Sequence, residues 1–147
     1  MKAISLVAVV ACLFILSCHS PNHTANSTNT MSDSAQLDGN WVLNLITAPG
    51  QEIDSLYKTK KPTISFDLAA NKFAGNTSCN NFNGPLKVSG NTISFADPFA
   101  MTRMACPGEG EKVFLETLNK VNRYSISNKN TLNFIVGDIA VMKFTRQ

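Results

Sequence analysis

Apolar and polar residues alternate in short runs along most of the chain, and turn-forming residues separate the runs. The segment from Thr63 to Leu68 alternates strictly, which places Ile64 and Phe66 on one face, as a half-buried β-strand requires. Pro62, just ahead, suits the first residue of a strand. We predict further strands at Trp41 to Ile46, Lys72 to Gly75, Leu86 to Val88, Thr92 to Phe95, Tyr124 to Ile126, Thr131 to Val136 and Ile139 to Thr145.

One segment has helical spacing instead. Between Glu111 and Val121 the apolar residues Phe114, Leu118 and Val121 recur at intervals that place them on one side of a helix. The acidic side chain at its start favours the helix dipole. The whole pattern therefore predicts a mainly β fold of the α+β class, with a small antiparallel β-barrel-like or strongly curved sheet of about eight strands and one amphipathic helix packed on it.

The chain begins with one positive charge, Lys2, and then runs apolar from Ala3 to Leu16. This run is shorter than the roughly 20 residues that a helix needs to cross a bilayer, and it is typical of a secretory signal peptide. The residues Ile15-Leu16-Ser17-Cys18 resemble the lipobox of bacterial lipoproteins, in which the cysteine receives the lipid. We therefore predict a signal peptide at residues 1–17 and a membrane anchor on Cys18.

Two other interpretations stay open at this point. The signal peptide could be an ordinary one that is cut elsewhere. The chain could also be a secreted eukaryotic protein, because Asn22, Asn26 and Asn76 each begin a glycosylation pattern.

A polar segment follows the predicted signal peptide. From His19 to Gln36 the chain is rich in Ser, Thr and Asn and has almost nothing to bury, so we predict that residues 18–36 are the lipidated cysteine and a disordered polar tether. One folded domain follows at residues 37–147, with Trp41 near its start. Loss of Lys2 with the signal peptide lowers the formal charge from +3 to +2, which favours no nucleic-acid partner.

Cys79 and Cys106 are the two cysteines that the predicted domain contains. An exported chain enters an oxidising compartment, so we predict a disulfide between them, closing a loop of 27 residues. Two separately buried thiols are the simpler alternative. A third possibility is a Cu(I) site, because Met101 and Met104 lie close to Cys106 and thioethers and thiolates are soft ligands.

Catalytic groups are scarce. Both histidines, His19 and His23, fall in the predicted tether, where no rigid structure would hold them beside a nucleophile. Three acidic residues, Glu109, Glu111 and Glu116, are best explained as a solvated helix face. The run Gly108-Glu109-Gly110 carries an acid where a phosphate loop would hold its anion. We therefore expect no enzyme activity, no cofactor and no metal.

Four blocks of the chain resemble the META domain, the family of the heat-shock-induced HslJ proteins of bacteria. The blocks are Leu37 to Trp41, Gly75 to Gly84, Thr102 to Cys106 and the helix with Phe114, and together they span about Leu37 to Phe144. Ser78 stands where family members usually have Gly. The resemblance implies a compact antiparallel β domain with one helix, in an envelope protein that is often a lipoprotein and sometimes linked to stress.

The Asn-rich block has two interpretations. Asn80, Asn81, Asn83 and Gly84 are turn formers, so we take the block as a structural loop with Phe82 as its apolar plug. The alternative is a recognition loop on a rigid scaffold.

We expect a lipid-anchored envelope module, held at the outer membrane by its lipid, that binds or supports other envelope components. The alternative is a carrier of a small apolar ligand, which requires a hollow interior. The side chains that would fill or line that interior are Phe66, Phe73, Phe82, Phe95 and Phe134.

Overall fold

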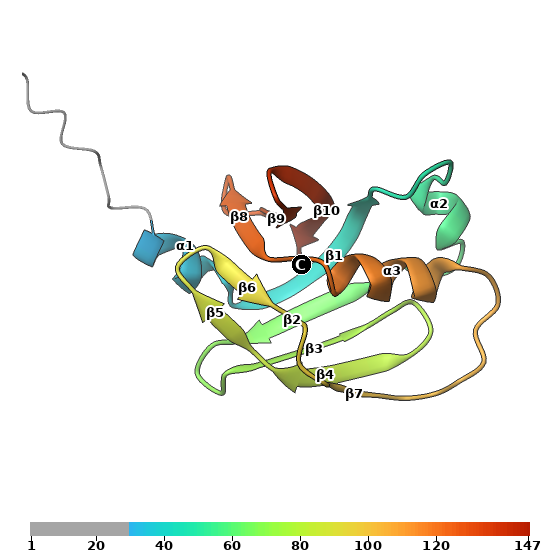
Figure 1. Ribbon diagram of the computed structural model, residues 1–147, viewed down its shortest axis with the longest axis horizontal. Helices are drawn as coiled ribbons and strands as arrows, with labels where there is room; N and C mark the ends of the chain where they lie inside the picture. Colours follow the sequence, from blue (N-terminus) through green and yellow to red (C-terminus); the bar gives the residue numbers. More distant parts are fainter. Residues whose placement is uncertain (1–29) are drawn as a thin grey trace, which may run out of the picture.

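The computed structural model describes residues 30–147, which form one strongly curved antiparallel sheet with three helices (Figure 1). The ten strands follow the order β5-β6-β8-β9-β10-β1-β2-β3-β4-β7 across the sheet. Their bounds are β1 Gly39–Ile46, β2 Thr63–Asp67, β3 Lys72–Asn76, β4 Asn81–Pro85, β5 Lys87–Ser89, β6 Thr92–Ser94, β7 Ala100–Met101, β8 Arg123–Ser127, β9 Thr131–Val136 and β10 Ile139–Arg146. The predicted fold class is confirmed, with ten strands in place of about eight.

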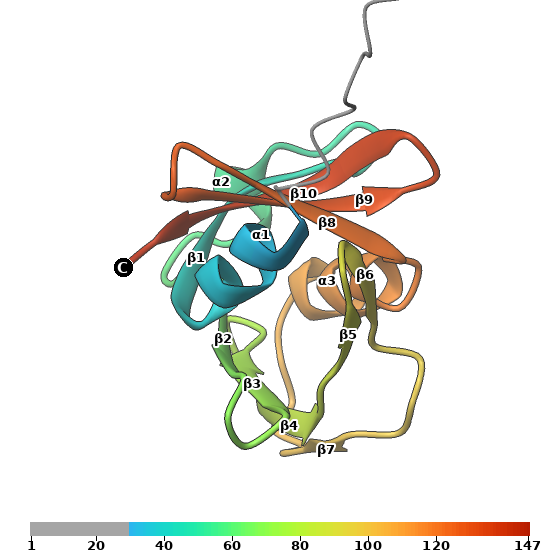
Figure 2. The ribbon, with the colours of Figure 1, turned by 90° about the vertical axis from the view of Figure 1, so that its left-hand side faces the viewer.

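The sheet curls around its own interior. Figure 2 shows it bending through β8, β9 and β10, so that β5 and β6 face β2 and β3 across the molecule. The helix α3 (Gly110–Leu118) lies inside this curve, and its Phe114 and Leu118 are fully buried. The predicted helix is therefore confirmed, although it begins one residue earlier than expected and ends at Leu118. A short helix, α2 (Ile53–Leu56), lies between β1 and β2 and was not predicted.

The N-terminal boundary differs from the prediction. Residues that we assigned to a disordered tether up to Gln36 form a helix, α1 (Thr30–Leu37), within the described part of the chain. Two contacts fix its end to the sheet: Leu37 is fully buried, and its carbonyl oxygen accepts a hydrogen bond of 2.9 Å from the Trp41 indole. The predicted signal peptide, Cys18 and both histidines lie outside the described residues.

Arg146, near the C-terminal end of the chain, packs against the same region. Its guanidinium carbon lies 4.2 Å from the centre of the Trp41 ring. The group also donates to the carbonyl oxygens of Gln36, Asp38 and Lys129, the last two at 2.8 Å and 3.0 Å. A planar group with several donors can stack on a ring and bond at its rim at the same time, so the last strand holds α1 and β1 together.

The interior of the sheet is filled by aromatic rings. Phe73 and Phe95 meet edge to face with ring centres 5.1 Å apart, and Phe95 contacts Phe134 at 5.4 Å. All five phenylalanines named by the carrier hypothesis are at most 4% exposed. In the described part of the chain these rings fill the interior of the sheet, so they give no support to the carrier hypothesis, which requires a hollow interior.

One predicted loop is a strand. Residues 81–85 form β4, which pairs with β3 on one side and β7 on the other, so the Asn-rich block is a turn only before Asn81. Phe82 points into the core at 3% exposure, whereas Asn81 and Asn83 are exposed on the other face. Pairing on both sides and burial of Phe82 outweigh the poor strand propensity of Asn and Gly.

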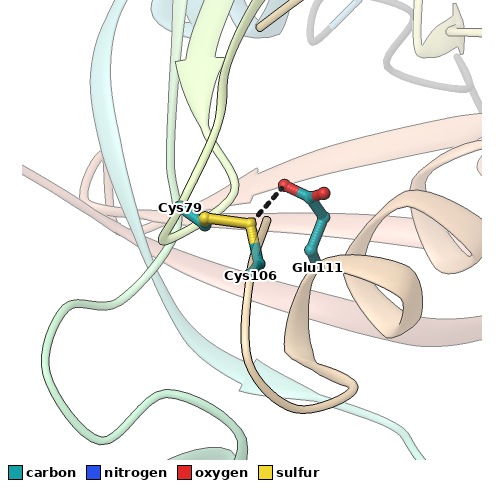
Figure 3. A group of neighbouring side chains, drawn as sticks. All are labelled: Cys79, Cys106 and Glu111. Carbon is teal, nitrogen blue, oxygen red and sulfur yellow. Dashed lines mark hydrogen bonds between the residues drawn. A yellow bond between two sulfur atoms is a disulfide. The ribbon is translucent and has the colours of Figure 1, made fainter. Parts of the chain in front are cut away.

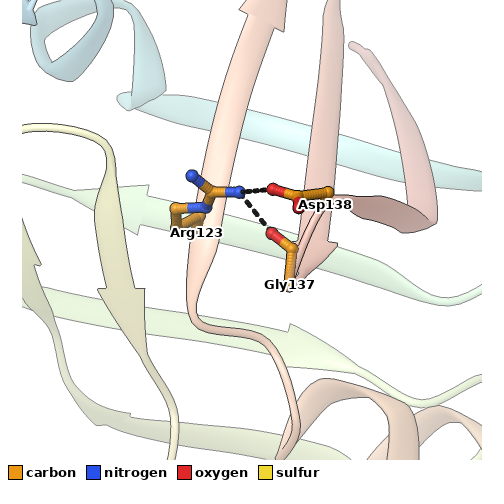
Figure 4. Close-up of polar contacts among 3 residues, drawn as sticks. All are labelled: Arg123, Gly137 and Asp138. Atoms are coloured by element: carbon orange, nitrogen blue, oxygen red, sulfur yellow. Dashed lines mark hydrogen bonds and ion pairs between the residues drawn. The ribbon is translucent and has the colours of Figure 1, made fainter.

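A surface ion pair joins β8 to the turn between β9 and β10. Figure 4 shows the Arg123 guanidinium donating to the Gly137 carbonyl oxygen and to Asp138, with 2.7 Å between Arg123 Nη2 and Asp138 Oδ1. Asp138 is almost fully exposed, so the pair contributes little to stability. No helix among residues 30–147 is both long and apolar enough to cross a bilayer.

Candidate functional site

A tight turn at residues 77–80 joins β3 to β4 and begins the candidate site. Its Thr77 hydroxyl oxygen accepts the Asn80 amide hydrogen at 2.9 Å, and the Asn76 side chain accepts the Ser78 amide hydrogen at 2.9 Å. Ser78 has a φ of 90°, in the region that favours glycine. The turn that family members make with Gly is therefore present here with Ser, held by these side-chain bonds.

The turn is covalently tied to the segment that precedes α3. Cys79 and Cys106, the predicted pair, are joined by a disulfide in the structure, with 6.0 Å between their Cα atoms (Figure 3). Both cysteines are partly exposed. The bond brings together two loops that are 27 residues apart in sequence and places them beside the first turn of the helix.

Asn80 is the centre of the site and is 1% exposed. Its side-chain oxygen accepts hydrogen bonds of 2.8 Å from the Thr102 hydroxyl and from the Met104 amide. Its side-chain nitrogen lies 3.1 Å from the Met104 carbonyl oxygen and 2.9 Å from Glu111 Oε2. One amide thus bonds groups from two separate segments, so its own polar atoms are satisfied, as those of a buried polar group must be.

The Glu111 carboxylate completes the cluster. It accepts a short hydrogen bond of 2.5 Å from the Thr77 hydroxyl in addition to the bond from Asn80. Its Oε2 also lies 3.7 Å from Cys106 Sγ, the contact drawn as a dashed line in Figure 3. A disulfide sulfur has no hydrogen to donate, so this is a close approach between a carboxylate and a sulfur and not a hydrogen bond.

An open groove of about 680 Å³ runs past the disulfide. One wall is formed by residues 55–59, which are the end of α2 and the residues after it, and the other is formed by the turn at 77–79 and the segment at 104–111. The Tyr57 hydroxyl donates to the Gly110 carbonyl oxygen at 2.8 Å, and burial raises the Tyr57 pKa well above its usual value. A Cβ atom on Gly110 would lie 2.8 Å from both the Leu56 carbonyl oxygen and the Tyr57 ring, so glycine lets the walls meet.

The side chains of the other candidate residues take no part in the hydrogen-bonded cluster around Asn80. Met104 lines the groove and is 58% exposed, whereas Met101 lies in β7 and does not line it. With both cysteines in a disulfide, the Cu(I) hypothesis has no thiolate in this form of the protein. Glu109 pairs with Lys112 on the surface, and Glu116 is exposed on α3 away from the groove.

The sequence did not predict the polar cluster of Thr77, Asn80 and Glu111. We took Glu111 as a solvated helix residue, yet it is half-buried and bonded to two side chains from the turn. The available signal was its position five residues after Cys106, because a disulfide at Cys106 brings the start of the helix against the turn that carries Cys79.

The geometry can now be compared with known proteins. A family model described as META domain matches residues 34–147. The chain belongs to the META domain family. This match confirms the resemblance, and its first residue lies inside α1, so the META domain of this chain begins before Leu37.

Solved structures share the fold of this META domain. An NMR structure of a protein from Burkholderia xenovorans is 19% identical, covers 99% of this chain and 97% of its own, and superposes with a TM-score of 0.64. A crystal structure of a DUF4847 family protein from Bacteroides vulgatus is 14% identical, with coverage of 78% and 96% and a TM-score of 0.54. No curated protein sequence matches the chain. At these identities the likeness establishes the fold alone.

Proposed function

We propose that this protein is a lipid-anchored envelope protein whose META domain is a non-catalytic binding module. The observation that carries the proposal is the open groove of about 680 Å³ beside the disulfide. It accommodates a segment of a partner protein, and its walls are held by the disulfide and by the bond from Tyr57 to Gly110. Walls that are already rigid lower the entropy cost of binding.

The filled interior supports a role at the surface. The phenylalanines that would line a ligand cavity pack against one another instead. The described residues contain no histidine, and the acids that line the groove, Glu109 and Glu111, are bound to a lysine and to the turn, respectively. A binding role therefore fits the site better than acid–base catalysis.

The anchor follows from the N-terminal sequence. Ser17-Cys18 after an apolar run supports lipidation of Cys18, and His19-Ser20 lacks an aspartate that would favour retention at the inner membrane. We place the protein at the outer membrane, with the residues between Cys18 and α1 as the tether. In this arrangement the groove is presented to other envelope proteins.

The experiment is site-directed photo-crosslinking in living bacteria that make the full chain. A photoreactive residue replaces Met104, which lines the groove, or Ile139, which is 67% exposed and does not line it. We expect a discrete adduct from position 104 and none from position 139, and we expect Cys18→Ser to abolish both labelling by a radioactive fatty acid and the adduct. Equal adducts from both positions, or none from position 104, would contradict the binding role, whereas lipid labelling of the Cys18→Ser chain would contradict the anchor.

A further inference from the structure

We propose that the reduced form of this protein binds Zn²⁺ through Cys79, Cys106 and Glu111. The inference is independent of the partner-binding role, because it concerns the state in which the disulfide is open. One ligand atom from each of the three residues lies within 4.8 Å of the other two. Two sulfurs and one carboxylate oxygen are a donor set that Zn²⁺ accepts.

The spacing of the carboxylate fits a tetrahedral site. Bonds of about 2.3 Å from zinc to thiolate and about 2.0 Å from zinc to carboxylate place a sulfur and an oxygen roughly 3.5 Å apart in a tetrahedron. Glu111 Oε2 lies 3.7 Å from Cys106 Sγ while the disulfide is still closed. Glu111 would therefore need almost no movement to become a ligand.

The sulfurs must separate from bonding distance to roughly 3.8 Å, the edge of a tetrahedron around zinc. Cys106 has room for this shift, because it lies in a stretch without regular structure between β7 and α3. Both cysteines line the groove and are partly exposed, so that a reductant can reach the bond and a water molecule can supply the fourth ligand.

Neighbouring side chains can donate hydrogen bonds to the proposed ligands. Thr77 donates to Glu111 Oε2 at 2.5 Å, which orients the carboxylate. The Asn80 side-chain nitrogen lies 3.1 Å from Cys106 Sγ and can donate to a thiolate there. Outer partners of this kind fix the geometry of metal ligands and tune their basicity.

The chemistry balances with a dithiol as the reductant. A thiolate of the dithiol attacks one sulfur of the Cys79–Cys106 bond, and the other sulfur leaves with the electron pair and takes up a proton. The second thiolate of the reductant then attacks the reductant's own sulfur in the mixed disulfide, and the remaining cysteine sulfur leaves with its electron pair and takes up the second proton. The dithiol becomes a disulfide, and the protein gains two electrons and two protons. Zn²⁺ binding releases these two protons as both thiols become thiolates.

The test uses the full chain with Cys12→Ser and Cys18→Ser, so that Cys79 and Cys106 are its only thiols. The protein is reduced with a dithiol, separated from it without oxygen, and titrated with Co²⁺, whose absorption bands report thiolate ligands, and then with Zn²⁺. We expect one Co²⁺ per chain, bound with release of two protons and then displaced by Zn²⁺ without further release, and no such bands from the oxidised protein.

Two variants separate ligation from charge. Glu111→Gln should weaken Zn²⁺ binding by more than the roughly 10–100-fold that loss of an outer partner costs, whereas Glu116→Gln on the exposed side of the same helix should leave it unchanged. Equal binding by the wild-type chain and Glu111→Gln, thiolate bands in the oxidised protein, or no binding at all would overturn the proposal.

The fold of the reduced protein is followed at the same time through the fluorescence of Trp41, the only tryptophan. If the reduced chain stays folded without metal, the titration gives its metal affinity directly. If the reduced chain unfolds, the proposal requires Zn²⁺ to restore the native fluorescence, and failure to do so would also overturn it.

Discussion

At the scale of single residues, Asn80 is the side chain on which the disulfide region depends. It is almost fully buried in the turn, and its side-chain amide bonds the segment before α3 and the first turn of that helix. No buried side-chain nitrogen or oxygen among the described residues is left without a partner, so a change at this position creates unpaired groups that are absent from the native protein.

Asn80→Asp tests this role with almost no change of shape. The new carboxylate would lie where the amide nitrogen now meets Glu111 Oε2 at 2.9 Å, so two like charges replace a hydrogen bond. We expect the free energy of unfolding at neutral pH to fall by roughly 3 kcal/mol, because unpaired buried charges cost more than neutral groups. Urea unfolding measures the loss.

Acidification should reverse part of this loss, since protonation of either carboxyl group removes the repulsion and restores a donor. The matched control is Asn83→Asp on the exposed face of β4, which we expect to change stability by no more than about 0.5 kcal/mol. Equal effects of the two substitutions would contradict the central role of Asn80.

At the scale of elements, α1 and β4 are the two whose sequences predict a different structure from the one observed. The α1 segment is polar, and its composition predicts a tether. In the structure Leu37 at its end is buried in the core, and Arg146 from β10 donates to the carbonyl oxygens of the two residues that flank Leu37. In β4, Asn81 and Asn83 suggest a turn, but Phe82 is buried between them and both edges of the strand are paired. In both cases one buried side chain and contacts from distant strands decide the structure.

Removal of α1 should therefore destabilise the domain. We compare a chain that begins at Asp38 with one that begins at Thr30. The shorter chain loses Leu37 and the acceptor of the Trp41 indole hydrogen bond. Deletion of a buried leucine side chain alone costs about 2–5 kcal/mol, and we expect a loss of at least this size, with a red shift of Trp41 fluorescence.

Thermal unfolding gives the measurement, and Leu37→Ala in the longer chain separates burial of the side chain from the presence of the helix. If the chain that begins at Asp38 were as stable as the chain that begins at Thr30, α1 would be part of the tether after all.

At the scale of the whole molecule, two features hold the domain together. The curved sheet encloses a filled aromatic core, and the disulfide closes a loop of 27 residues that includes β4 to β7. The core contributes through burial of apolar surface, whereas the disulfide acts mainly by restricting the unfolded chain. The core can therefore keep the reduced protein folded.

Replacement of both Cys79 and Cys106 by Ser should lower the free energy of unfolding by about 3–4 kcal/mol, the entropy of closing a loop of this length. The free energy of unfolding of a single domain is commonly about 5–15 kcal/mol, so we expect the variant to fold. Denaturant unfolding measures the difference, and an increase of two mass units on reduction of the native chain establishes that the bond is present. An unchanged mass would show that the bond is absent, and a variant as stable as the native chain would contradict the stabilising role of the disulfide.

The alternation of apolar and polar residues was sufficient to predict eight strands, the helix at Phe114 and the fold class, because these depend on which side of each element is buried. The four blocks around Trp41, Cys79, Cys106 and Phe114 were sufficient to identify the family. Local pattern carries this information because the spacing of side chains along a strand or helix is a property of the backbone itself.

Only the tertiary structure decided the rest. The helix at Thr30–Leu37, the strand at Asn81–Pro85 and the cluster of Thr77, Asn80 and Glu111 each depend on partners far away in the sequence. The filled interior likewise depends on how rings from separate strands meet. Propensity and periodicity describe neighbours along the chain, whereas burial and hydrogen bonding between distant segments are set when the sheet curls and brings those segments together.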